Sequence, residues 1–203
     1  MSRCFRPVMD TNLVAVSLAG LPCSGKTTLA REYSKEFIDV LYEPRIAQPL
    51  QSVADDLDTF LRLQSRAFEE EILRLNRLRR VAAQHGKTVI IQDRGCDDIL
   101  CYTEYYLTHV LRADPSQCVS VAGDRPVTSL VVYIDIPSDV LDDRIARRSK
   151  RSCWRGLSDV STYLSFYHAW FRQRSGVSIL PVSSEGMLET LYLLDELIRR
   201  HIC

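Results

Sequence analysis

The chain lacks an excess of charge of either sign, since its 203 residues carry 26 acidic and 26 basic side chains. This balance gives the whole molecule no electrostatic reason to bind nucleic acid or a membrane, so any basic patch must be local. No run of apolar residues approaches the ~18 that a membrane-spanning helix needs. The sequence therefore predicts neither a nucleic-acid partner nor a membrane partner.

The seven cysteines lack any Cys-x-x-Cys pair and any Cys/His spacing typical of a metal site. Scattered thiols in a chain of this length favour a reduced, intracellular protein over a disulfide-linked one. The first nine residues carry two arginines and no acid, yet they have no apolar core like that of a secretory signal. We therefore expect a cytoplasmic protein, with a mitochondrial leader as the alternative.

Hydrophobic residues make up 46% of the chain and charged residues 26%, which is ordinary for a globular protein. This length and composition predict a single domain over residues 1–203. Short apolar, β-rich runs predict strands at 13–19, 38–43, 88–92, 130–136 and 177–182. Helical patterns lie at about 26–37, 54–84, 96–112, 138–150, 159–174 and 185–201. Strands that alternate with helices indicate a three-layer α/β domain, in which helices cover both faces of a five-stranded parallel sheet.

One stretch, at about 113–128, fits neither pattern. It contains Pro115, Gly123 and Pro126, which are typical of turns. We expect it to be a surface loop inserted between the third helical pattern and the fourth strand.

Residues 20–27 are Gly-Leu-Pro-Cys-Ser-Gly-Lys-Thr and match the phosphate-loop pattern G-x-x-x-x-G-K-[ST] without deviation. A strand is predicted before them and a helix after them, which is the context that the motif requires. The two glycines let backbone N–H groups point at the phosphates of a nucleotide. Lys26 should reach the β- and γ-phosphates, and the Thr27 hydroxyl should ligate Mg²⁺. The cofactors predicted are therefore ATP and Mg²⁺, with ATP bound by Gly20, Leu21, Pro22, Cys23, Ser24, Gly25, Lys26, Thr27 and Thr28.

Two common classes of phosphate-loop protein are excluded by motifs that the chain lacks. A signalling GTPase needs Asn-Lys-x-Asp, and neither Asn12 nor Asn76 stands in such a setting. A transporter ATPase needs Leu-Ser-Gly-Gly-Gln, which is absent. Small kinases remain, and three further features favour them.

The first feature is the pair Asp93-Arg94 at the end of the third predicted strand. An acid there should lie beside the magnesium of the phosphate loop, and the adjacent arginine can neutralise charge on the group being transferred. We expect Thr27 and Asp93 to hold the metal, and Arg94 to act in catalysis and substrate binding. The alternative is that Asp93 only caps the following helix.

The second feature is a basic segment in which six cations and no acid occupy residues 144–155. We interpret residues 144–156 as an arginine lid that closes over ATP, because phosphoryl transfer depends on charge stabilisation. Arg144 and Arg148 are expected to bind ATP, and Arg147 and Arg148 to act in catalysis. Two other interpretations stay open, cations that stabilise a helix C-terminus and a nucleic-acid patch.

The third feature is Glu43-Pro44 at the end of the second predicted strand. Ligands gather at the carboxyl ends of parallel strands, so Glu43, Asp93 and the phosphate loop should face one crevice. A carboxylate there can accept a proton from an attacking hydroxyl. A solvated turn residue is the alternative for Glu43.

Together these motifs resemble the deoxynucleoside kinase and thymidylate kinase group over about residues 12–200. The resemblance implies the P-loop NTPase fold with strand order 2-3-1-4-5 and a nucleoside-like or nucleotide-like acceptor. It also implies that Glu43 is the catalytic base and that Gln64 recognises the acceptor base. Gln64 lies on the apolar stripe of the helix at 54–84, where an internal hydrogen bond would satisfy its amide equally well.

The chain also departs from both kinase types. Asp93-Arg94-Gly95 replaces the Glu-Arg-Ser of deoxynucleoside kinases, and the glycines that follow Glu-Pro in thymidylate kinases are absent. Asp93-Arg94-Gly95 with Asp97-Asp98 is similar to the ribosylnicotinamide-kinase-like P-loop ATPase/kinase domain. A monophosphate acceptor would need further cations, for which Arg45 and Arg66 are candidates.

We therefore expect ATP- and Mg²⁺-dependent phosphoryl transfer to a hydroxyl of a nucleoside or related small molecule. A nucleoside monophosphate kinase and a regulatory P-loop ATPase are the alternatives. The apolar positions of the helices at 54–84 and 96–112 fit either a homodimer face, as in the resembling kinases, or packing in the core.

Overall fold

The computed structural model describes residues 13–44, 56–122, 128–147, 160–182 and 186–202. Its centre is one sheet of five parallel strands in the order β2-β3-β1-β4-β5. The strands are β1 (Val14–Ala19), β2 (Val40–Glu43), β3 (Val89–Asp93), β4 (Leu130–Asp135) and β5 (Val177–Pro181). The predicted fold class, strand number and strand order are confirmed.

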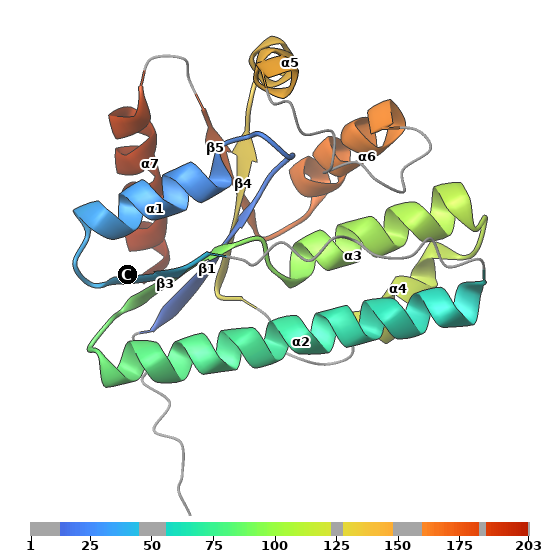
Figure 1. Ribbon diagram of the computed structural model, residues 1–203, viewed down its shortest axis with the longest axis horizontal. Helices are drawn as coiled ribbons and strands as arrows, with labels where there is room; N and C mark the ends of the chain where they lie inside the picture. The colour runs from blue at the N-terminus through green and yellow to red at the C-terminus, as the bar shows by residue number, and fades with distance from the viewer. Residues whose placement is uncertain (1–12, 45–55, 123–127, 148–159, 183–185, 203) are drawn as a thin grey trace, which may run out of the picture.

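Helices cover both faces of this sheet, and α1 and α7 lie on the face opposite α2, α3 and α6 (Figure 1). The helices are α1 (Lys26–Glu36), α2 (Leu57–Gln84), α3 (Cys96–Tyr105), α4 (Cys118–Ala122), α5 (Ser138–Arg147), α6 (Val160–Gln173) and α7 (Met187–Ile202). A π-helical turn, Tyr106–Val110, extends α3, and a 3-10 turn, Pro115–Gln117, precedes α4. Within the described ranges every helix is too short or too polar to span a bilayer.

The central strand β1 is buried along its whole length, as its nearly continuous apolar sequence predicts. Val14, Val16 and Leu18 pack toward α1 and α7. Ala15 and Ser17 alternate with them on the other face, where small side chains let the next layer come close. An added methyl group at Gly95, just before α3, would lie only 2.4 Å from the Ser17 Oγ atom, so the start of α3 fits tightly against β1.

The long helix α2 begins at its N-cap Asp56, whose side chain accepts a hydrogen bond of 2.8 Å from the Thr59 N–H. Its apolar stripe packs on the sheet at one end and on α3 and α4 at the other. Core packing therefore accounts for the stripe that the sequence also allowed as a dimer face. Among the described residues of α2, Leu73 is the large hydrophobic side chain that stays exposed.

The stretch at 113–128 differs from the expected surface loop, because part of it is the helix α4. Val121 of α4 is buried against Phe68 of α2 and Ile99 of α3. The remaining turn residues 123–127 lie outside the described ranges. A helix of five residues is too short to produce a recognisable period in sequence, and the flanking prolines and glycine dominate the pattern.

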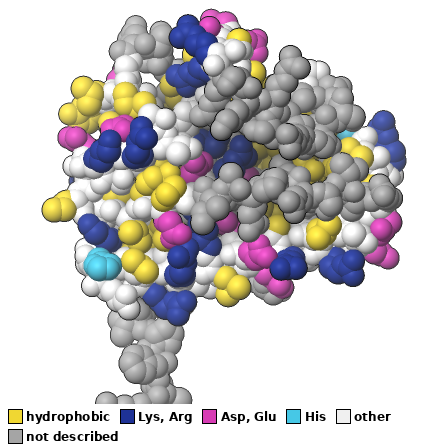
Figure 2. Space-filling model, viewed as in Figure 1, with side chains coloured by type: hydrophobic (Ala, Val, Ile, Leu, Met, Phe, Trp, Pro, Cys, Tyr) yellow, Lys and Arg dark blue, Asp and Glu magenta, His cyan; other side chains and the backbone are white. Residues whose placement is uncertain are grey.

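On the face drawn in Figure 2, acidic and basic side chains are interspersed over the described surface. This agrees with the equal numbers of acidic and basic residues in the chain. Glu43, Asp93 and the phosphate loop lie at the carboxyl ends of β2, β3 and β1, where the predicted motifs meet.

Candidate active site

The phosphate loop joins β1 to α1, and its two glycines take backbone angles that other residues rarely adopt. Gly20 has φ 156° and Gly25, the N-cap of α1, has φ 99°. The N-cap offers no side-chain hydrogen bond to the first turn of α1. The N–H groups of that turn therefore have no side-chain cap, and together with the helix dipole they favour an anion at this end. The third residue with positive φ in the loop is Cys23, at 69°.

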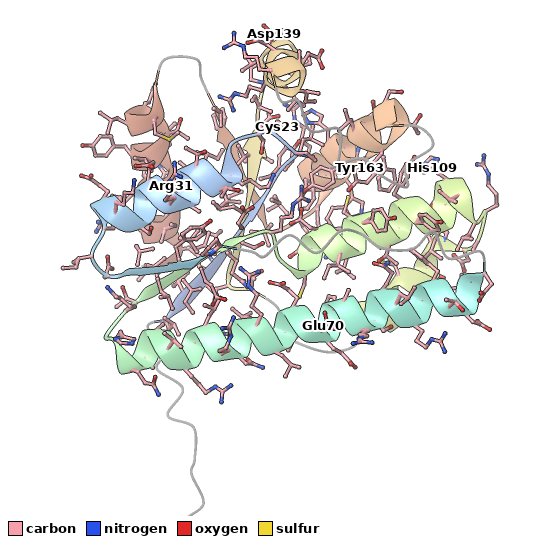
Figure 3. The ribbon with its side chains drawn as sticks, viewed as in Figure 1. Cys23, Arg31, Glu70, His109, Asp139 and Tyr163 are labelled. Atoms are coloured by element: carbon pink, nitrogen blue, oxygen red, sulfur yellow. The ribbon has the colours of Figure 1, made fainter. Side chains whose placement is uncertain are left out.

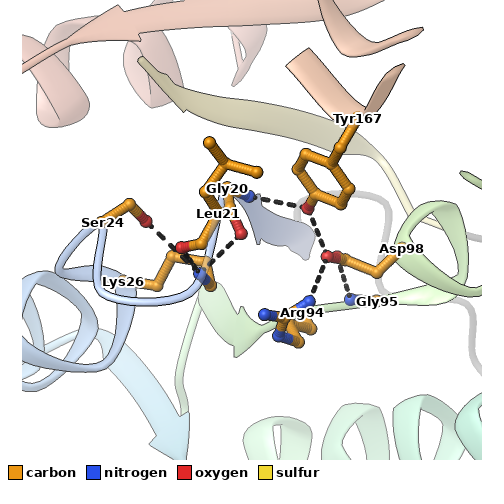
Figure 4. Close-up of polar contacts among 8 residues, drawn as sticks. All are labelled: Gly20, Leu21, Ser24, Lys26, Arg94, Gly95, Asp98 and Tyr167. Carbon is orange, nitrogen blue, oxygen red and sulfur yellow. Dashed lines mark hydrogen bonds and ion pairs between the residues drawn. The ribbon is translucent and has the colours of Figure 1, made fainter. Parts of the chain in front are cut away.

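Lys26 folds back over the loop, with its ammonium group against loop oxygens (Figure 4). Its Nζ atom donates to the backbone oxygens of Gly20 at 2.7 Å and Leu21 at 2.8 Å, and to Ser24 Oγ at 3.3 Å. Burial, and then the neighbouring Arg94 cation, lower the pKa of Lys26 to about 7. A polyphosphate in the loop would add negative charge directly beside this lysine and so favour its protonated form.

Thr27 and Asp93 meet beside that lysine. The Thr27 hydroxyl donates a hydrogen bond to Asp93 Oδ2, although the residues are 66 positions apart in the chain. Leu18 at the end of β1 is the register partner of Asp93 at the end of β3, which brings the two strand ends together. A hydroxyl and a carboxylate are hard oxygen donors, so they fit Mg²⁺, which usually takes one or two protein ligands together with phosphate and water. The described residues contain no cluster of three or more His, Cys, Asp or Glu side chains that could hold a metal without such help.

Arg94 has a left-handed backbone, with φ 68°, and its N–H donates to the Leu18 oxygen at 3.1 Å. Its Nη1 atom forms an ion pair of 3.0 Å with Asp98 Oδ1, one turn along α3. Burial is the largest single effect and would lower the pKa of Arg94, but the charge of Asp98 and the smaller effects of its other neighbours together raise the pKa above its ordinary value. The guanidinium therefore stays charged next to the loop.

The Asp98 carboxylate links Arg94 to the phosphate loop through a chain of hydrogen bonds (Figure 4). It accepts from the Gly95 N–H at 3.3 Å and from the Tyr167 hydroxyl at 2.5 Å. The same hydroxyl accepts from the Gly20 N–H at 3.0 Å. No sequence motif indicated Tyr167, and only the i,i+4 spacing of Arg94 and Asp98 could have suggested their ion pair.

Glu43 ends β2 at the same edge of the sheet, because it pairs in register with Gln92, the neighbour of Asp93. Its side chain is 33% exposed, and its Oε1 atom accepts from Arg77 Nη2 at 2.5 Å. Its backbone oxygen accepts from Arg74 Nη2 at 3.2 Å. The expected carboxylate is thus at the expected edge, but two arginines of α2 that the motifs did not indicate accompany it.

The two residues expected on α2 for the acceptor lie in different surroundings. Gln64 is partly buried, and its Oε1 atom accepts from Thr103 Oγ1 of α3 at a long 3.4 Å. Arg66 has a 78% exposed side chain and pairs along its own helix with Glu70 (3.1 Å), which Figure 3 shows on α2, away from the loop that carries Cys23. The internal hydrogen bond foreseen for Gln64 therefore exists in weak form, and Arg66 is not brought to the loop. Arg45 lies outside the described residues.

Of the predicted lid, the structure brings Arg144 to the loop. Arg144 Nη1 on α5 donates to the Ser24 oxygen at 3.1 Å. Arg147 has a 78% exposed side chain and pairs with Asp143 at 2.7 Å. Arg148 and the rest of the basic segment to residue 156 lie outside the described residues.

A cavity of about 150 Å³ opens next to Arg144, on the side of the loop away from Glu43. Its lining combines this guanidinium with apolar side chains from β4 and α7 and with the loop backbone. The lining residues are Ser24, Gly25, Leu29, Ile134, Arg144, Val182, Gly186, Met187 and Thr190. A planar base beside the phosphates fits this chemistry. Sequence motifs missed Ile134, Met187 and Thr190, because they come from two segments, β4 and α7, that lie far from the phosphate loop in the chain.

Comparisons with known proteins agree with this architecture. A family model described as an AAA domain matches residues 16–162. Thymidylate kinase from Candida albicans superposes with a TM-score of 0.57 at 13% identity, over 95% of this chain and 94% of that one. Deoxyadenosine kinase from M. mycoides, with the products dCMP and dCDP bound, gives 0.56 at 14% identity over 92% of this chain and 99% of that one. The same enzyme with dATP bound gives 0.52 at 16% identity, over 91% and 99%.

At these low identities, the superpositions show a shared fold. The neighbours belong to the kinase group that the motifs resembled. No curated protein matches the chain in sequence.

Proposed function

Since the chain belongs to the AAA domain family, we propose that it transfers the γ-phosphoryl group of ATP to a hydroxyl of a nucleoside or a closely related small molecule. One observation carries the proposal, the buried Lys26 ammonium held over the phosphate loop with the Thr27–Asp93 pair beside it. A structural loop has no need of a desolvated lysine next to a second cation, whereas a polyphosphate site does. The kinase-fold neighbours support the same reaction class.

On the donor side, the loop backbone and Lys26 bind the ATP phosphates, and Thr28 joins them at the first turn of α1. Arg144 and the adjacent cavity take the purine base. Arg147 and Arg148 belong to a lid at about 144–156 that adds positive charge when ATP is bound. Thr27, through its hydroxyl, and Asp93, through a water molecule, hold Mg²⁺. When bound, this ion neutralises charge between the β- and γ-phosphates.

On the acceptor side, Glu43 takes the proton of the attacking hydroxyl. The hydroxyl oxygen forms a bond to the γ-phosphorus while the bond from that phosphorus to the bridging oxygen of ADP breaks. Arg94 neutralises charge on the group in transfer. Gln64 exchanges its long contact with Thr103 for an edge of the acceptor base.

A second candidate is a nucleoside monophosphate kinase, and one observation favours it. Arg77 and Arg74 lie beside Glu43 on the acceptor side, where an acceptor phosphate would need cations. Nucleosides, their monophosphates and nicotinamide riboside should therefore be screened by thermal shift with a non-hydrolysable ATP analogue. The acceptors that stabilise the protein are then assayed for phosphate transfer, and the paired nucleoside and monophosphate rates separate the two candidates.

The proposed roles of Lys26 and Arg94 predict that Lys26→Ala and Arg94→Ala each lower kcat by at least about 100-fold. Circular dichroism should show both variants folded. Lys35→Ala is the matched control, because Lys35 lies on the same helix with a 63% exposed side chain and pairs with Glu32. Near-wild-type transfer in either site variant would refute its role. Phosphate release that no acceptor changes would instead indicate a regulatory ATPase.

A further inference from the structure

We propose that Tyr167 is a positioning residue for phosphoryl transfer, which couples the phosphate loop to Arg94 through the Asp98 carboxylate. The inference rests on the proposed kinase function and adds to it a residue on α6. Three observations support it: the hydrogen bonds of one hydroxyl, the partners of one carboxylate, and the burial of the ring.

The Tyr167 hydroxyl uses its donor and one acceptor site at once. It accepts from the Gly20 N–H at 3.0 Å and donates to Asp98 Oδ1 at 2.5 Å. Gly20 opens the phosphate loop, and it is 147 residues from Tyr167 in the chain. A single side chain on α6 therefore fixes the distance between the entry of the loop and the first turn of α3.

The Asp98 carboxylate passes this constraint on to Arg94. The oxygen that accepts from Tyr167, Oδ1, also pairs with Arg94 Nη1 at 3.0 Å. The other oxygen accepts from the Gly95 N–H, and the Arg94 backbone is held on β1 through the Leu18 oxygen. Because the Arg94 backbone is fixed, only its side-chain torsions can reorient the guanidinium. The ion pair with Asp98 holds the guanidinium in one orientation.

Because Tyr167 is buried, no solvent water can take over the hydrogen bonds of its hydroxyl. The Tyr167 ring is fully buried in the cluster that contains Ala19 and Leu21 on either side of Gly20. The helix that carries it packs on α3 through Tyr163, which is labelled in Figure 3. The Tyr163 ring meets the rings of Tyr102 and Tyr105 edge-on. Burial, and then the Asp98 charge, raise the pKa of Tyr167 well above its ordinary value, so the hydroxyl keeps its proton and remains a donor.

The test compares Tyr167→Phe with Tyr133→Phe. Tyr133 is also buried, and its hydroxyl also bonds to α6, at 2.8 Å from His168 Nδ1, but outside the loop and Arg94. Each variant loses one hydroxyl, and Tyr167→Phe should lose more thermal stability because its hydroxyl makes two hydrogen bonds, one of them to a buried carboxylate. Turnover is therefore measured well below both melting temperatures. We expect Tyr167→Phe to lower kcat by about 10- to 100-fold with the KM for ATP within about twofold, because the reacting groups are misplaced while the phosphate contacts remain. Tyr133→Phe should keep the wild-type kcat. Equal kcat in the two variants would overturn the proposal.

A double-mutant cycle shows whether Tyr167 acts through Arg94. In an Arg94→Ala background, adding Tyr167→Phe should change kcat by less than about twofold, because the guanidinium to be positioned is gone. Effects that multiply would overturn the coupling. The four proteins of the cycle are also compared by calorimetry, which measures their affinity for ADP with aluminium fluoride. Aluminium fluoride mimics the γ-phosphoryl group in transfer, and its binding needs no acceptor.

These two readouts separate the inference from the function on which it rests. The wild-type protein could transfer phosphate to none of the screened acceptors and still show the coupling in the fluoride affinities. That result would refute the proposed function alone. A wild-type kinase whose cycle shows independent, multiplying effects would remove the role of Tyr167 alone. A wild-type protein that binds neither nucleotide complex would remove both.

Discussion

Lys26 is the residue whose environment most directly determines how the site responds to its ligand. Its ammonium group rests on two carbonyl oxygens and a hydroxyl, and burial holds its pKa near 7. Above that pH the free protein increasingly carries a neutral lysine. A bound polyphosphate places negative charge beside the amine and moves the pKa back up, because an opposite charge favours the protonated form.

Nucleotide binding should therefore take up a proton at Lys26. Because the folded pKa lies below the ordinary 10.5, uptake should be small at pH 6 and approach about one proton above pH 8. The affinity for Mg·ATP should fall over the same range as pH rises. Calorimetry in buffers of different ionisation enthalpy measures the uptake, and Lys26→Met should abolish it. Equal proton uptake in the variant would show that another group titrates.

The residues that the sequence could predict are those that one local motif contains. The phosphate loop and the pair Asp93-Arg94 each occupy a few consecutive positions, so pattern and strand context were enough to predict that they meet at one edge of the sheet. Tyr167 and Arg77 contact Gly20 and Glu43, which are 147 and 34 residues away in the chain. No local pattern contains such a pair, and its geometry appears only when the sheet has formed.

Among the elements, periodicity predicted the five strands and the long helices. Each strand buries several apolar residues, and each long helix buries an apolar face that repeats over several turns. The helix α4 was missed, and its place in the core makes a test. Its five residues include Val121, which is buried, and Val119, which is 72% exposed. The two valines therefore form a matched pair on one short element.

Val121→Ala should lower the free energy of unfolding by about 2 kcal/mol, because it opens a cavity between α2 and α3. Val119→Ala should change it by less than about 0.5 kcal/mol, since that side chain faces solvent. Urea titration of both variants gives the two values. Equal, small effects would mean that α4 does not dock on the core in solution.

For the whole molecule, the central position of β1 unites the two halves of the fold. It pairs with β3 on one side and β4 on the other, and its two faces contact different helix layers. The single domain expected from chain length remains a proposal, which the cooperativity of unfolding can test.

Unfolding in urea should occur in one transition, with tryptophan fluorescence and far-ultraviolet circular dichroism giving the same midpoint. A non-hydrolysable Mg·ATP analogue at 100 times its Kd should add about 2.7 kcal/mol to the free energy of unfolding and move both probes together. Lys26→Met should reduce that gain. Two separate midpoints, with only one shifted by the analogue, would show that the chain unfolds as two units.

The tight approach of Gly95 to Ser17 has a mechanical consequence. From Ser17 the path runs through Gly95 to Asp98, then to Tyr167 and Gly20, and returns along β1 to Ser17. The approach of Gly95 to Ser17 is a packing contact, and the other links are hydrogen bonds among buried groups, so water reaches any one of them only when the surrounding packing opens. Amide hydrogens around this circuit, that of Gly20 included, should therefore exchange with solvent together, in one opening event shared by three distant segments.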